Sequence, residues 1–129
     1  MLKSSAFYNT LLASDAALLA LLGPGGKILN AWPQLVTAFP CVIFQDVNQA
    51  DREFGDNAPT MSELRVQVDI FTKDAAGAPK SSDLGIAVAN VFAKEFFYCP
   101  SNGEVPDDTV GVRHRRMVFT RAVSASDLV

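Results

Sequence analysis

Four arginines and the only histidine of the chain lie within one short stretch near its C-terminal end. The stretch GVRHRRMVFTRAV, residues 111–123, holds Arg113, His114, Arg115, Arg116 and Arg121. Side chains of these types bind phosphates, transfer protons, or form ion pairs with the carboxylates of a neighbouring subunit. The stretch is therefore a candidate for nucleic-acid binding, for catalysis or for a subunit contact.

Catalysis by His114 would require a nucleophile in a recognisable arrangement. The sequence has no G-x-S-x-G nucleophile elbow and no active-site cysteine signature. One histidine and the two distant cysteines, Cys41 and Cys99, are too few ligands for a tetrahedral zinc site. The acidic segment DREFGD, residues 51–56, lacks the spacing of a calcium-binding loop. We therefore expect no enzymatic activity, no metal and no cofactor, and a structural role for His114.

The overall charge argues against a broad nucleic-acid-binding surface. The 129 residues carry a net charge of −3, whereas nonspecific nucleic-acid binders present extended basic surfaces. In a strand, Arg113 and Arg115 would share one face with Met117, and His114 and Arg116 would share the other. Neither face is uniformly basic. Charge on both faces suits a strand that leaves the core toward an edge or a subunit contact, although binding of nucleic acid by the 113–121 arginines remains an alternative.

The N-terminal residues 4–22 predict a bent or broken helical arm, with a short second helix over residues 15–22. Apolar side chains recur there at three- and four-residue spacing, and Gly23 with Pro24 ends the pattern. The uninterrupted apolar run, residues 16–22, is much shorter than the ~20 residues that cross a bilayer. We expect no membrane segment, and we expect the two cysteines to be reduced thiols of a protein made in the cytoplasm, with a single disulfide as the alternative.

The central residues 41–72 predict two antiparallel strands. In ELRVQVDIFT, residues 63–72, apolar positions alternate with Arg65, Gln67, Asp69 and Phe71, which is typical of a strand with one buried face. The intervening residues 48–62 are polar and rich in turn-forming types, so they predict a long projecting loop.

The remaining segments complete the expected fold. Residues 28–32 predict a short strand, residues 81–97 a helix with one apolar stripe, residues 100–108 a loop, and residues 110–123 a final strand. The predicted class is α/β in the α+β sense. It consists of a mostly antiparallel or mixed sheet of about four strands, with helices packed on one face, and forms a single domain over residues 1–129.

Taken in order, these segments resemble a known family. The phrases SDAALLALLG, ILNAWPQ, FPCVIFQDV, VDIFTKD, LGIAVANVF and TVGVRHRRMVF are similar to those of the tail terminator, or tail-completion, proteins of long-tailed phages and prophages. The resemblance implies a virion protein, assembled in the host bacterial cytoplasm, that forms a hexameric ring on the tail tube. Such a ring ends tube polymerisation and offers a surface to the head, while DNA passes through its lumen.

The resemblance supplies no catalytic residues, so the candidate site residues are contacts. Arg65, Gln67, Asp69 and Phe71 on the polar face of the central strand are candidates for the ring interface. Arg113, Arg115 and Arg116 are candidates for intersubunit salt bridges or for the lumen. The implied partners are further copies of the chain, the tail tube protein, a head-completion or neck protein, and DNA bound without sequence specificity. A head–tail connector ring, a nucleic-acid-binding protein and a small hydrolase using His114 are the alternatives.

Overall fold

A computed structural model describes residues 5–30, 39–55, 58–75, 77–106 and 110–124. The elements occur along the chain in the following order: α1 (Ser5–Ala13), α2 (Ala16–Leu22), β1 (Lys27–Asn30), β2 (Cys41–Gly55), β3 (Ala58–Lys73), α3 (Ser81–Ala93), β4 (Tyr98–Val105) and β5 (Val112–Ser124). None of the helices within these ranges is long and apolar enough to cross a membrane.

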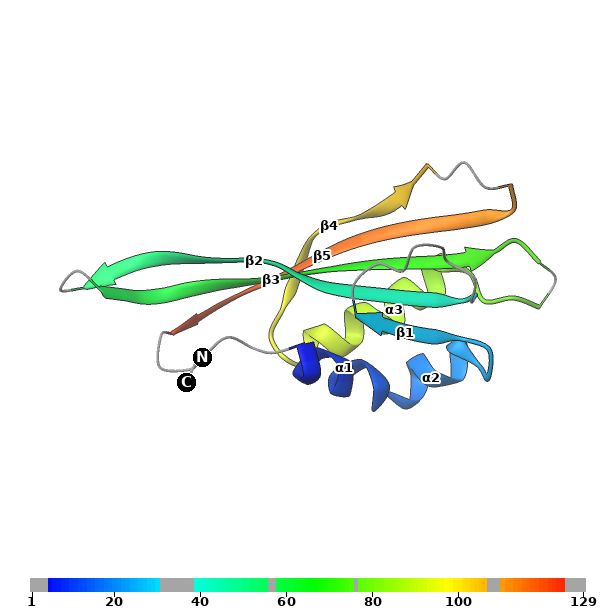
Figure 1. The fold of residues 1–129 in the computed structure, drawn as a ribbon, viewed down its shortest axis with the longest axis horizontal. Coiled ribbons are helices and arrows are strands. Elements are labelled where there is room, and N and C mark those ends of the chain that lie inside the picture. Colours follow the sequence, from blue (N-terminus) through cyan, green and yellow to red (C-terminus); the bar gives the residue numbers. More distant parts are fainter. Residues whose placement is uncertain (1–4, 31–38, 56–57, 76, 107–109, 125–129) are drawn as a thin grey trace.

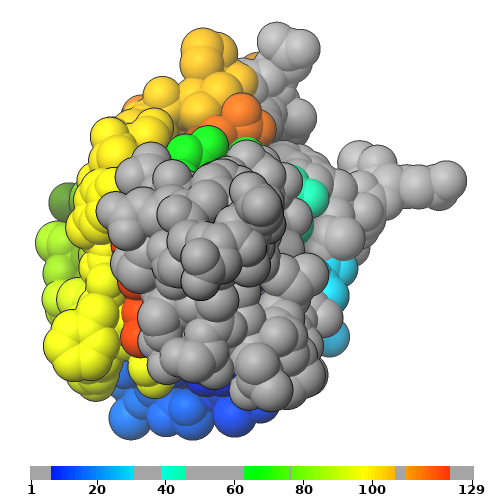
Figure 2. All heavy atoms as spheres, turned by 90° about the vertical axis from the view of Figure 1, so that its left-hand side faces the viewer, coloured from blue at the N-terminus to red at the C-terminus, as the bar shows by residue number. Residues whose placement is uncertain are grey.

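The strands form one sheet in the order β1-β2-β3-β5-β4. Strand β1 runs parallel to β2, and the other neighbours are antiparallel. All three helices lie against one side of the sheet (Figure 1). In the perpendicular view, the blue N-terminal helices run along the bottom and the yellow segment after α3 forms the left margin (Figure 2). The predicted class, a mostly antiparallel sheet with helices on one face, is confirmed, with β4 as a strand that the sequence did not predict.

The core lies between the sheet and the helices. Val66, Val68 and Ile70 of β3 are fully buried on the helical side, as the alternation in residues 63–72 predicts. They meet side chains from β2, β5 and all three helices: Val42, Phe44, Met117, Phe119, Tyr8, Leu12, Leu18, Leu84, Val88 and Phe92. Burial of each large apolar side chain stabilises the fold by about 1.5–3 kcal/mol, so this single layer holds the helices on the sheet.

Asp15 and Gly23 define the two ends of the second N-terminal helix. The Asp15 carboxylate accepts a hydrogen bond from the Leu18 amide at 2.9 Å, which caps the start of α2. The same hydrogen bond, aided by the nearby Lys94 ammonium, lowers the pKa of Asp15 against the opposing effect of burial. At the other end, Gly23 has a φ of 67° and ends the helix. The helical segment predicted over residues 4–22 thus consists of two helices, α1 and α2. Residue 4 lies outside the described residues.

The predicted loop over residues 48–62 is wrong, because β2 and β3 continue through most of it. Their pairing extends from Asn48 opposite Arg65 to Gly55 opposite Ala58, with irregularities near Asp51 and Glu53. The end of β5 pairs with β3 as far as Met61 opposite Ser124. We call the described part of this segment, residues 48–55 and 58–62, the arm. It projects beyond the helical layer (Figure 1), and its eight residues Asn48–Gly55 extend over roughly 25 Å.

The helix predicted over residues 81–97 ends earlier, at Ala93. The Phe97 amide donates to the Phe92 carbonyl at 3.1 Å, and the Phe96 amide donates to the Ala93 carbonyl at 3.0 Å. This pair of hydrogen bonds is typical of helices that end at a residue in the left-handed conformation. Phe96 is that residue, with a φ of 64°. The chain then turns into β4, which replaces most of the loop predicted over residues 100–108.

Both cysteines are free thiols. Cys41 is buried on the side of the sheet away from the helices, among Ile43, Phe71 and partly buried apolar side chains. Desolvation raises the pKa of its thiol. Cys99 donates a hydrogen bond to the Ser101 carbonyl at 3.1 Å, and partial burial raises its pKa as well. Two protonated thiols apart from one another fit the reduced state that the sequence indicated.

Candidate functional site

Strand β5 divides the charged residues of the opening stretch between the two faces of the sheet. Arg115 lies opposite Glu104 of β4, on the helical side, whereas Arg116 lies opposite Asp69 of β3. We call the sheet face away from the helices the open face. Alternation along β5 places His114 with Arg116 on the open face, as the sequence predicted.

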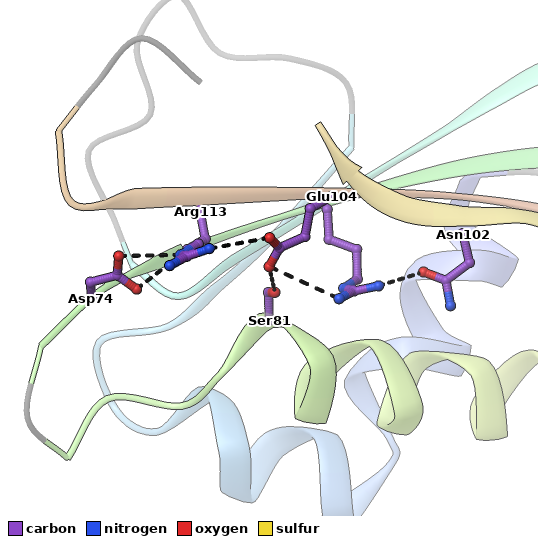
Figure 3. A network of polar contacts seen from close by, with 6 residues as sticks. Asp74, Ser81, Asn102, Glu104 and Arg113 are labelled. Carbon is purple, nitrogen blue, oxygen red and sulfur yellow. Dashed lines mark hydrogen bonds and ion pairs between the residues drawn. The ribbon is translucent and has the colours of Figure 1, made fainter. Parts of the chain in front are cut away.

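On the helical side, Arg113 is held by two carboxylates at the end of the sheet (Figure 3). Its Nε atom lies 3.2 Å from Asp74 Oδ2, and its Nη1 atom lies 3.3 Å from Glu104 Oε2. Asp74 raises the pKa of the Arg113 guanidinium, with Glu104 adding to the effect. The Ser81 hydroxyl donates to Glu104 at 2.8 Å, and this bond is the main reason that the pKa of Glu104 is lowered, with Arg113 and Arg115 contributing. The cluster ties the start of α3 to β4 and β5.

Arg115 completes this cluster and lies across α3. Its Nη1 atom donates to Asn102 Oδ1 at 2.9 Å, and its Nη2 atom lies 4.0 Å from Glu104. A Cβ atom at Gly85 would come within 3.0 Å of Arg115 Cδ, so the absent side chain at that helical position leaves room for the arginine stem. Arg113 and Arg115 are therefore engaged within the chain.

On the open face, Asp69 is the centre of a buried polar cluster. Its Oδ1 atom lies 2.6 Å from His114 Nε2 and 2.9 Å from Arg116 Nε, and its Oδ2 atom accepts from Gln67 Nε2 at 2.8 Å. The Phe71 ring stacks on the imidazole with 4.2 Å between ring centroids. Both carboxylate oxygens are thus occupied, as a buried charge requires.

The exposure of the predicted contact residues separates them into two groups. Arg65, Gln67, Asp69 and Phe71 share the open face as predicted, but Asp69 is 0% exposed and Phe71 4% exposed. The four side chains therefore share one face, as the sequence pattern predicts, but Asp69 and Phe71 are buried within the chain. Arg65, with 40% of its side chain exposed, and Arg116, with 42%, do reach solvent.

His114 lacks the access that a catalytic base needs. The residue is 6% exposed, and its imidazole lies between the Phe71 ring and the Asp69 carboxylate. Substrate must come within hydrogen-bond reach of a general base, so this arrangement supports the structural role predicted for the histidine. Within the described part of the chain, no three His, Cys, Asp or Glu side chains are grouped to hold a metal ion.

The open face carries a cationic surface that we call the patch. The patch is the group of five partly exposed, neighbouring residues of β2, β3 and β5 near the middle of this face, among the side chains that the structure describes: Gln45, Arg65, Gln67, Arg116 and Val118. The carboxylates that pair with its arginines lie beneath them, because the side chain of Glu63 is only 8% exposed and that of Asp69 is 0% exposed. Sequence reasoning could not find this layering, since alternation does not show which side chains of one face cover the others.

Comparison with known proteins defines the class of protein. A solved chain from the "Virion of native gene transfer agent (GTA) particle" is 20% identical, covers 91% of each chain and has a TM-score of 0.59, which shows the same fold. No curated protein matches the chain. The family described as "Tail completion protein gp17" matches residues 9–98, which are 90 of the 129 residues.

The chain belongs to the tail completion protein gp17 family. It is a structural protein of a phage tail, located in the virion. The resemblance of its sequence to tail-completion proteins is confirmed. The family and the fold give no positive indication of catalysis, in agreement with the burial of His114.

Proposed function

We propose that this protein forms a ring on the end of the tail tube, stops the addition of further tube subunits and provides the surface that joins the head. Membership of the tail completion family supports this role. The observation that carries it furthest is the arm, a β-ribbon that leaves the core and projects past the helices. An extended ribbon outside the core is suited to contacts with other chains rather than to stabilising its own domain.

The proposed ring is a hexamer built from head-to-tail contacts. In a heterologous interface, one surface of each copy binds a different surface of the next, and a rotation that closes gives a ring. The arm and the patch are two such different surfaces. The tail tube protein and a head-completion or neck protein bind the two sides of the ring, and DNA passes through the lumen without sequence-specific contacts.

The candidate residues have distinct roles in this proposal. Arg65, Gln67 and Arg116 contact the neighbouring copy because they reach solvent on the open face. Asp69 holds Gln67 and Arg116 in place from beneath, and Phe71 stacks on His114, which also contacts Asp69. Arg113 and Arg115 stabilise the end of the sheet through ion pairs with Asp74 and Glu104. Because their charges are paired within the chain, they are poorly suited to bind nucleic acid.

Light scattering and negative-stain microscopy of the purified protein, with and without isolated tail tubes, test the proposal. We expect rings at one end of each tube, whether or not rings also form in the absence of tubes. A protein that stays monomeric and does not bind tubes would contradict the proposal. Rings that bind heads but not tubes would favour a head–tail connector. Salt-dependent binding of DNA by the monomer would favour a nucleic-acid-binding protein.

A further inference from the structure

The exposed charge of the patch is positive. Arg65 Nη2 lies 2.8 Å from Glu63, and Arg116 Nε lies 2.9 Å from Asp69, but both carboxylates are almost or entirely buried. In these two pairs the arginine side chains are 40% and 42% exposed, so the exposed charge is almost entirely theirs. The Arg65 Nε atom is itself buried and has no hydrogen-bond partner. A surface of this kind favours an anionic partner, because arginine at an interface binds carboxylates with paired hydrogen bonds.

The arm has the opposite charge. The sequence of residues 48–62 contains Asp51, Glu53 and Asp56 but only one basic residue, Arg52, which gives this segment a net charge of −2. Residues 48–62 are therefore acidic on balance, and the arm is the part of them that projects from the body.

The arm cannot bind the patch of its own chain. Strands β2 and β3 stay paired from the patch, at Gln45 and Arg65, into the arm, with a register shift between Asp46 and Asn48. A paired ribbon leaves the sheet along the strand direction and does not fold back flat over the face from which it emerges. The occupant of the patch must come from another molecule, and a second copy of this chain carries an acidic ribbon of the required charge and reach.

We propose that the acidic arm of one copy lies on the cationic patch of the next copy. The inference rests on the proposed ring, and it identifies which surfaces meet between neighbours. Opposite charges on the arm and the patch fix the direction of the contact, since arm against arm and patch against patch would repel. The contact is head-to-tail and therefore of the kind that closes a ring.

Charge reversal tests the contact on both of its sides. The patch variant carries Gln45→Glu and Arg65→Glu, and it leaves the buried Asp69 cluster unchanged. The arm variant carries Asp51→Lys and Glu53→Lys. We expect each variant alone to need a protein concentration about tenfold higher or more for ring formation, because like charges then face one another. Thermal unfolding monitored by circular dichroism establishes that both variants are folded.

A matched control changes charge elsewhere. Lys80→Glu with Ser82→Glu alters the net charge by the same amount as the patch variant, at exposed positions at the start of α3. We expect this control to form rings like the unaltered protein. If the control lost rings as the patch variant does, the effect would be one of total charge, and the arm–patch contact would be wrong.

An equimolar mixture of the two variants gives the sharper result. The acidic arm of the patch variant fits the cationic patch of the arm variant, and the basic arm of the arm variant fits the acidic patch of the patch variant. We expect the mixture to form alternating rings at concentrations at which neither variant assembles. Unaltered protein that forms rings, together with a mixture that does not, would overturn the arm–patch contact and leave the ring intact. Unaltered protein that forms no rings even on tubes would overturn the proposed function itself.

Discussion

Asp69 and Arg116 form an ion pair that runs from the buried layer of the open face to its surface, with Asp69 Oδ1 2.9 Å from Arg116 Nε. The carboxylate has no exposed surface, whereas 42% of the arginine side chain is exposed. The pair therefore fixes a cation at the surface by means of an anion that solvent and partners do not reach. This relationship links the stability of the sheet to the charge that the proposed ring presents to its neighbours.

Loss of the Asp69 charge should destabilise the fold strongly. Asp69→Asn leaves Arg116 and His114 without their shared carboxylate, and loss of hydrogen bonds to a charged group costs about 1.5–3 kcal/mol. Urea denaturation measures the change in the free energy of unfolding. Asp74→Asn is the control, because both Asp74 and its partner Arg113 are more than half exposed, so it should have little effect. Equal effects of the two substitutions would contradict the central role of Asp69.

Glycine at position 96, just after α3, should make the protein more stable than the native phenylalanine does. Phe96 has a φ of 64° and is 80% exposed, so Phe96→Gly removes a backbone penalty and little burial. We expect the free energy of unfolding to rise by about 0.5–1 kcal/mol. Phe96→Ala keeps a Cβ atom in the same conformation and should give no such gain. Thermal unfolding of the two variants makes the comparison, and equal stability would show that the left-handed backbone carries no penalty.

The fold was predictable where a segment has one buried face. Val66, Val68 and Ile70 alternate because they face the helices, and the period of two shows this directly. The arm and β4 have no continuous apolar face. Their polar, glycine- and proline-containing sequences, such as YCPSNGEV in β4, therefore resemble loops, and pairing with neighbouring strands overrides that local preference.

The candidate site was predictable as a set of residues on one face and not as a layered surface. Asp69 and Arg65 occupy equivalent positions in the alternating pattern, yet one is fully buried and the other reaches solvent. Which of them is covered depends on contacts across the sheet, which sequence spacing does not contain. The end of α3 was missed for a related reason, because Phe96 occupies a conformation that usually requires glycine.

The cap of α2 should make stability depend on acid pH. The pKa of Asp15 is lowered in the folded protein, mainly by the Leu18 amide and also by Lys94. A lowered pKa means that the carboxylate stabilises the fold above its unfolded pKa, and that this contribution is lost as the pH falls through the folded pKa. Asp15→Ala should cost about 1 kcal/mol at neutral pH, and the difference should shrink in acid. A difference that stays constant from pH 7 to pH 2 in urea denaturation would contradict this assignment.

The length of the tail tubes tests the central claim most directly. Particles assembled without this protein should contain tubes of variable and excessive length that carry no head, because nothing then stops polymerisation or offers a joining surface. Supply of the protein should restore uniform tubes joined to heads. Electron microscopy of the two preparations measures the length distribution. Tubes of normal, uniform length in the absence of the protein would contradict the account, since termination would then not depend on it.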